Sequence, residues 1–198
     1  MARGKVNSDS FYAEYSGHKV RHLEKILPAL RASSDRIIWT AGDSSLDNKY
    51  WFEARAEAPG LYGALLQPAI SKQDVTFWLN HLCQQSQQPN SVNSHRSRTS
   101  AINAAVEAST LGERTFALRP QDRFLRDNIQ EEDVLVVSVG GNDIALMPSP
   151  CTIASILGVL SLPSSCVEKG CACGAIPIDD YCCGCGPSLC SCAFACRE

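Results

Sequence analysis

The run Asp133-Val-Leu-Val-Val-Ser-Val139 is the feature that most restricts the fold of this chain. Its apolar residues are continuous and mostly β-branched, rather than alternating with polar residues. This pattern is typical of a strand that is buried on both faces, as in a parallel sheet covered by helices. We therefore expect an α/β fold with a parallel sheet.

The residues before and after this run alternate between helical and extended patterns. Apolar spacing, together with Pro, Gly and capping residues, predicts two further strands and five helices. The strands are residues 36–41 and 100–106, and the helices are residues 18–30, 46–58, 71–85, 119–129 and 153–162. This order predicts a three-layer α/β/α sandwich with right-handed crossovers. Three strands are few for such a sheet, so we expect it to be incomplete.

Two of the helices carry more specific expectations. Pro28 should kink the first helix or mark its last turn, because proline removes a backbone donor. In the helix 71–85, Ser71 and Asp74 resemble a capping box. The apolar side chains that should face the core there are Val75, Trp78, Leu79 and Leu82.

Composition limits the partners of the chain. The 198 residues have an apolar fraction of 44%, enough for a core, and a net charge of -3, which gives no electrostatic case for nucleic acid or anionic membrane. The sequence contains no run of 18 apolar residues, so we expect no membrane-spanning helix. The amino terminus lacks the apolar run of a signal peptide. We expect a cytoplasmic protein with a flexible lead-in (1–17), an α/β domain (18–163) and an irregular cysteine-rich segment (164–198).

Ten of the 11 cysteines lie at or after Cys151, and Cys83 is the exception, expected to be an inert buried thiol. Between Cys166 and Cys196 the spacing is dominated by Cys-Cys and Cys-x-Cys pairs, and no histidine falls among them. A disulfide-stapled or low-complexity insertion, thiolate binding of Zn or Cu(I), and S-acylation all suit this pattern.

Polar motifs follow two of the expected strands. Gly42-Asp43-Ser44 follows the first strand, and Gly140-Gly141-Asn142-Asp143 follows the third. Because parallel strands end at the same edge of a sheet, we expect the motifs at the ends of all three strands to converge. Ser44 would then supply a nucleophile and Asn142 a donor to an oxyanion. The alternative is that these residues only cap helices and form tight turns.

Together the two motifs resemble blocks I and III of the SGNH (GDSL-type) hydrolases, which are esterases and lipases on a flavodoxin-like sheet. Between them, Asn103-Ala-Ala-Val-Glu-Ala-Ser-Thr110 resembles a degenerate block II, with Ala108 where the family usually has a glycine. The resemblance covers about residues 35 to 160. It implies Ser44 as the nucleophile, with the Ser44 and Ala108 amides and the Asn142 side chain as oxyanion donors. A positive φ would be strained at Ala108.

The family's last block, Asp-x-x-His, which supplies the catalytic base, has no counterpart here. The histidines are His18, His22, His81 and His95, all before the third strand. Without a base within hydrogen-bond reach, serine is a poor nucleophile. We therefore expect a fragment or a degenerate homologue of a cofactor-free hydrolase of small carboxylic esters. The alternative is a non-catalytic ligand-binding protein or a protein that binds metal through cysteine thiolates.

Overall fold

The computed structural model describes residues 5–86, 98–146, 153, 157 and 160–165. These residues form a mixed α/β fold with parallel strands, as the sequence predicts. The chain divides into two units, residues 1–140 and 141–198. The central sheet belongs to the first unit, and α7 (Gly141–Ala145) belongs to the second.

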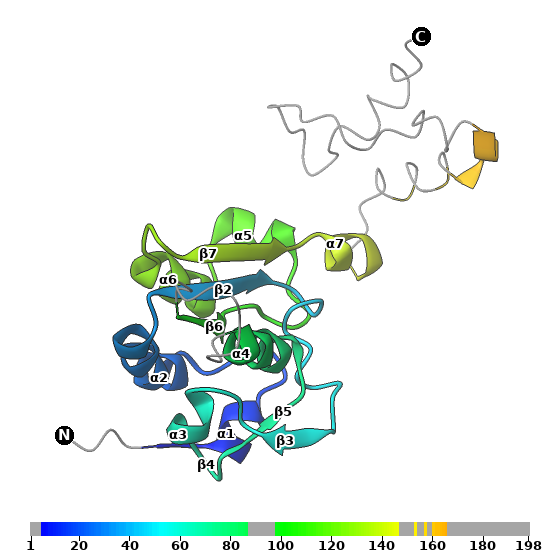
Figure 1. Ribbon diagram of the computed structural model, residues 1–198. Coiled ribbons are helices and arrows are strands. Elements are labelled where there is room, and N and C mark those ends of the chain that lie inside the picture. Colours follow the sequence, from blue (N-terminus) through cyan, green and yellow to red (C-terminus); the bar gives the residue numbers. More distant parts are fainter. Residues whose placement is uncertain (1–4, 87–97, 147–152, 154–156, 158–159, 166–198) are drawn as a thin grey trace. The chain divides into compact units, whose positions relative to one another are not determined.

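The central sheet contains β2 (Arg36–Gly42), β6 (Thr99–Asn103) and β7 (Val134–Ser138) in the order β6-β2-β7. Both pairings are parallel, and Trp39 lies opposite Ile102 on one side and Leu135 on the other. The arrowheads of the three strands point the same way in Figure 1. The three expected strands and their parallel pairing are confirmed, although β6 ends three residues earlier than expected.

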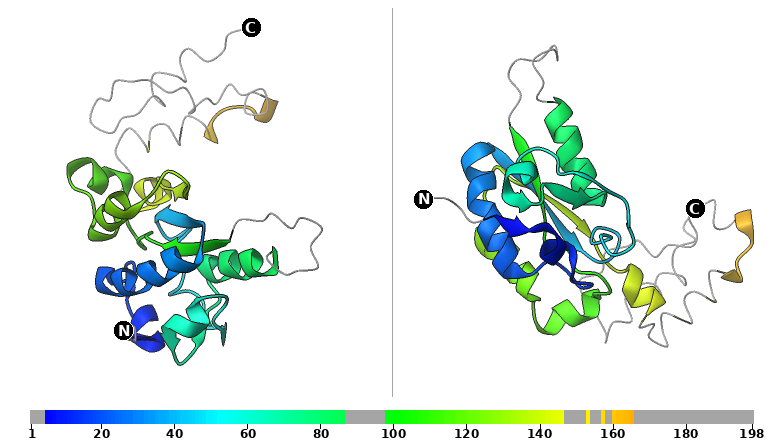
Figure 2. Two further views of the ribbon diagram at one scale, coloured as in Figure 1. Left: turned by 60° about the vertical axis from the view of Figure 1, so that its left-hand side comes forward. Right: turned by 90° about the horizontal axis from the view of Figure 1, so that it is seen from below.

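One face of the sheet packs against α2 (Val20–Ser33) and α6 (Pro120–Asn128), which lie next to each other (Figure 2). Pro28 lies inside α2, so it does not mark the last turn. Alternate residues of β2 point into this core, and the Trp39 ring lies 5.8 Å from that of Phe124. The buried core includes Leu23, Ile26, Leu30, Ile37, Trp39, Ile102, Phe124 and Leu125.

The outer edge of β6 is covered by α4 (Val75–Ser86) and α3 (Tyr62–Leu65). The Asn80 side chain accepts from the Ala101 amide (2.9 Å) and donates to the Ala101 carbonyl (3.1 Å). The Tyr62 hydroxyl also donates to this carbonyl, at 3.0 Å. Covering an edge in this way prevents pairing with another chain.

The buried face of α4 is not the expected one. Its buried side chains are Thr76, Phe77 and Asn80, whereas Trp78 and Leu82 are exposed. The prediction was wrong because α4 binds the strand edge through a polar amide rather than through its apolar stripe. The helix also begins later than expected, because Ser71 belongs to β5 and Asp74 accepts the Phe77 amide at 2.8 Å.

The predicted helix 46–58 is wrong as well. Turns follow β2, and residues 55–57 form β3 (Arg55–Glu57), which pairs antiparallel with β5 (Ile70–Lys72). The physical reason is burial of the polar residues Asp47 and Lys49, which a regular amphipathic helix would have left in solvent. A short helix, α5 (Leu111–Phe116), follows β6 and has a capping box between Thr110 and Glu113.

The residues expected to form a flexible lead-in are structured from Lys5 onward. They form β1 (Val6–Asn7) and α1 (Ser8–Tyr12), and β1 pairs in parallel with β4 (Leu66–Gln67). Val6, Phe11 and Tyr12 are buried in the same core as α2. These elements are too short to show a helical or strand periodicity in the sequence, so they could not be predicted from it.

The strand that most restricted the fold is itself less buried than expected. Val134, Leu135, Val136 and Val137 are between 38% and 56% exposed, so burial on both faces is wrong for the described residues. Among the described strands, β7 pairs only with β2 and therefore forms an edge of the sheet. The carboxylate just before β7, on Asp133, is nevertheless fully buried, where it accepts from Arg31, Trp39 and the Ile37 amide.

Within the described part of the chain, no helix combines the length and apolar character needed to cross a membrane.

Asp74 should give the stability of the fold a measurable pH dependence. Burial raises the pKa of Asp74 from 3.8 to about 6, although the Phe77 amide opposes the shift. Since the folded state then binds this proton more tightly than the unfolded chain, the stabilisation is present below pH 4 and is lost as the pH rises through 6. Asp74→Asn should remove the loss. Its free energy of unfolding should rise relative to that of the wild type by roughly 2–3 kcal/mol between pH 4 and 7.

Urea unfolding at several pH values measures this difference. Asp9→Asn, at an exposed carboxylate, is the matched control and should show no such rise. A difference between Asp74→Asn and wild type that stays constant from pH 4 to 7 would contradict the assignment.

Candidate active site

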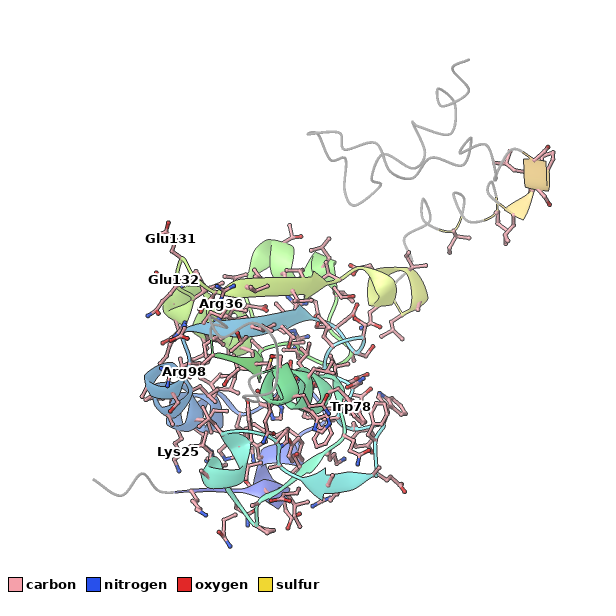
Figure 3. All side chains as sticks on the ribbon, in the orientation of Figure 1. Lys25, Arg36, Trp78, Arg98, Glu131 and Glu132 are labelled. Atoms are coloured by element: carbon pink, nitrogen blue, oxygen red, sulfur yellow. The ribbon has the colours of Figure 1, made fainter. Side chains whose placement is uncertain are left out.

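Ser44 lies in a hydrogen-bonded turn at the carboxyl end of β2. The Asp43 carbonyl accepts from the amides of Leu46 (3.1 Å) and Asp47 (2.9 Å), and its carboxylate accepts from the Ser45 amide (3.0 Å). The expected helix therefore does not form, and a single turn carries the half-buried Ser44. This end of the sheet is opposite the one marked by Arg36 and Arg98 (Figure 3).

Gly42 allows β2 and β7 to approach closely beside this turn. Its φ is +141°, and a Cβ atom at this position would lie 1.8 Å from the Ser138 carbonyl oxygen. The same carbonyl accepts from the Asp43 amide at 3.0 Å, and the Ser45 hydroxyl donates to the Ser138 hydroxyl at 2.7 Å. Glycine is therefore required before Asp43, because any side chain would separate the two strand ends.

The loop after β6 is held against the same residue. The Gly42 carbonyl accepts from the Val106 amide (2.9 Å), the Ser109 hydroxyl (3.1 Å) and the Arg114 guanidinium (3.1 Å). The loop that carries Ala108 is thus fixed beside the turn that carries Ser44. This confirms that the first two strand-end motifs converge.

Asn103 holds this edge together from inside. Its side-chain oxygen accepts from the Thr40 hydroxyl (2.9 Å) and the Ala105 amide (2.8 Å). Its amide nitrogen lies 3.4 Å from both an Asp47 carboxylate oxygen and the Leu46 carbonyl. Asn103 is 2% exposed, so it positions the two loops and is not placed to contact a substrate.

A buried ion pair that the sequence interpretation missed lies beneath Ser44. Asp47 and Lys49 have fully buried side chains, and the ammonium lies 2.5 Å from the carboxylate. The second carboxylate oxygen accepts from the backbone amides of Gly17 (2.7 Å) and Glu107 (2.8 Å). Two charged residues after a polar motif are typical of a solvated surface, so their burial could not be predicted from the pattern.

Ala108 has a backbone conformation that favours glycine. Its φ is +59°, in the left-handed region where a side chain is strained. Among the described residues, no acceptor binds the backbone amide of Ala108 or that of Ser44. Their roles as oxyanion donors stay a prediction.

The third motif spans the boundary between the two units. Gly140, with a φ of +102°, ends the first unit, and Gly141, Asn142 and Asp143 begin α7 in the second. They start a short helix, as their capping interpretation predicts. The role of the Asn142 side chain as an oxyanion donor stays a prediction.

None of the three described histidines hydrogen-bonds Ser44. His18 is buried against Phe11, its Nδ1 lies 2.9 Å from the Phe11 carbonyl, and burial lowers its pKa to about 3. His22 is also buried, and burial lowers its pKa. His81 pairs with Gln85 on α4. His95 lies outside the described residues.

A metal site is not found in the part of the chain that the structure describes, where no three His, Cys, Asp or Glu side chains gather. The cysteines from 166 to 196 lie outside that part, so binding of Zn or Cu(I) by them stays a prediction. Cys83 is half-buried on α4, and burial raises the pKa of its thiol. A raised pKa disfavours the reactive thiolate.

Comparisons of the chain with protein-family models, curated proteins and solved structures found no match.

Ala108→Gly tests the strained loop. Because glycine adopts positive φ without a steric cost, the variant should be more stable than the wild type by up to about 1 kcal/mol. Ala105→Gly, in the same buried loop but without a positive φ, should be less stable by a similar amount. Urea unfolding measures both. Equal destabilisation by the two substitutions would contradict the strain at Ala108.

Proposed function

We propose that this chain carries an SGNH-type serine hydrolase domain that acts on carboxylic esters through Ser44. The observation that carries the proposal is the strand order. In chain order, β6-β2-β7 reads second-first-third, which is how the flavodoxin-like order 2-1-3-4-5 begins. Ligands in such sheets bind at the switch point between the first and third strands. Ser44 follows the first strand, whose end contacts Ser138 of the third.

The three-layer, flavodoxin-like architecture is part of the proposal. Helices α2 and α6 on one face of the sheet support it, as does the parallel pairing of all three strands. The first and third strand-end motifs of the family resemblance then fall on the strands that border the switch point. The degenerate second motif falls on the neighbouring strand β6.

In the proposed reaction, the Ser44 oxygen attacks the ester carbonyl carbon and passes its proton to solvent water, which returns a proton to the departing alcohol. The carbonyl oxygen becomes an anion, which the free amides of Ser44 and Ala108 would stabilise by hydrogen bonds. Collapse of the intermediate expels the alcohol, and water then releases the acid from the acyl-enzyme. In the family, a histidine accepts the serine proton. Since no described histidine hydrogen-bonds Ser44, we expect slow acylation.

The second candidate is a ligand-binding domain without catalysis. The positions of His18 and His22 favour it, because both rings are buried away from solvent and burial lowers the pKa of each. In this case the same edge would bind an ester or a carboxylate without cleaving it.

Covalent labelling with a fluorophosphonate tests the role of Ser44. The wild-type chain should be labelled slowly, and added imidazole should accelerate labelling because it supplies the missing base. Ser44→Ala should lower the rate by at least about tenfold. Ser45→Ala is the matched control, since that neighbouring hydroxyl is bound to Ser138 and should not react.

Equal labelling of wild type and Ser44→Ala would overturn the proposal. Labelling that depends on Ser45 instead would also overturn it. No labelling of the wild type even with imidazole, together with reversible ester binding, would support the second candidate.

A further inference from the structure

Three aromatic rings gather on the surface beside the turn that carries Ser44. Tyr15, Tyr50 and Trp51 are 41%, 52% and 63% exposed, and we call them the aromatic corner. Tyr50 lies 4.9 Å from Tyr15 and 5.6 Å from Trp51 between ring centroids, with interplanar angles of 88° and 87°. The third pair lies 6.5 Å apart at 75°. The rings are therefore nearly perpendicular to one another, like three faces of a box.

The aromatic corner is held in place by Asp47. The Asp47 carboxylate accepts the Gly17 amide, two residues after Tyr15, and the Trp51 amide donates to the Asn48 carbonyl at 3.1 Å. The backbone amide of Asp47 donates to the Asp43 carbonyl and so closes the turn that contains Ser44. The segment of Tyr15 is thus bound to the buried Asp47, and the segment of Trp51 is closed by a turn at the neighbouring Asn48.

A buried carboxylate lies against the corner. Glu107 is 4% exposed, and its Oε1 accepts from the Tyr15 hydroxyl at 3.3 Å. Its Oε2 has no hydrogen-bond partner among the described residues. Burial raises the pKa of Glu107, although hydrogen bonding of its carboxylate to the Trp51 and Tyr15 side chains opposes the shift. A buried carboxylate oxygen without a donor is costly, and a nearby positive charge would lower that cost.

The charges beneath the corner leave an excess of acid. Asp47 is paired with the ammonium of Lys49, so this ion pair is neutral. Glu107 has no ion-pair partner of its own among the described residues. The Lys72 ammonium is bound to the Lys49 carbonyl at 2.9 Å.

We propose that the aromatic corner and Glu107 form a binding site for a quaternary ammonium group. Aromatic faces carry a negative quadrupole, and cages of such rings bind alkylated ammonium ions. A carboxylate behind the rings adds a full negative charge, which a neutral ligand of the same shape would not use. The methyl groups of the ion match the apolar rings, and its charge matches Glu107.

The site also suggests a substrate class. If Ser44 is the nucleophile, the ammonium group would belong to the ester substrate, since Tyr50 and Trp51 follow the turn that contains Ser44. This placement rests on the proposed function, whereas binding of the cation itself does not.

Isothermal titration calorimetry of the full chain tests the site with choline and with 3,3-dimethylbutan-1-ol. The second compound has the shape of choline with a carbon atom in place of the charged nitrogen. Choline should bind, and the neutral compound should bind at least about tenfold more weakly. Trp51→Leu, Tyr50→Leu and Glu107→Gln should each weaken choline binding by about three- to tenfold.

Trp78→Leu is the matched control. Trp78 is another exposed tryptophan, and its ring contacts are Phe77 and His81 on α4 rather than the corner (Figure 3). It should bind choline like the wild type. Thermal unfolding of each variant separates a lost site from a lost fold.

Equal binding of the charged and neutral compounds would overturn the proposal, because it would show that the rings bind apolar groups without using the positive charge. Absence of choline binding at millimolar concentration would overturn it as well, and so would binding of a neutral sugar alone. Ser44→Ala should keep choline binding. Choline binding without Ser44-dependent labelling would therefore contradict only the proposed function. Ser44-dependent labelling without choline binding would contradict only this inference.

Discussion

The buried carboxylate of Asp47 is the group on which the carboxyl edge of the sheet depends. It pairs with Lys49 and accepts the amides of Gly17 and Glu107, so it joins the amino-terminal segment, the turn after β2 and the loop after β6. A buried charge that loses its partner costs several kcal/mol, so these three segments are stable only together. The turn that carries Ser44, the loop that contains Ala108 and the segment of Tyr15 are all bound to this one residue.

The strands and the main core helices could be predicted from the sequence, because their apolar spacing reports burial directly. The spacing in α2 and α6 and the apolar run of β2 are signals of this kind. The turn after Gly42 could not be predicted, since it depends on burial of Asp47, which only distant residues make possible. The exposure of β7 could not be predicted for a related reason. An apolar run shows that a strand can be buried, but not which of its faces other elements cover.

The candidate site was predicted in part. The loop that carries Ala108 is bound to Gly42, two residues before Ser44, and Ala108 has a positive φ. Asn103 proves to be a buried organiser of the loops, with both ends of its amide in use. Glu107 was missed because an acidic residue in a degenerate motif looks like a solvated one. Its burial depends on Tyr15, which lies 92 residues away along the chain.

Backbone amide hydrogen exchange of Gly17 and Glu107 tests the central role of Asp47 most directly. In the wild type both amides should exchange slowly, because they donate to a buried carboxylate. Lys49→Met should speed their exchange by at least about tenfold. The Ile37 amide, which donates to Asp133 at 2.8 Å, should keep its rate. Fast exchange at Gly17 and Glu107 in the wild type, or rates unchanged by Lys49→Met, would contradict the dependence of this edge on the buried pair.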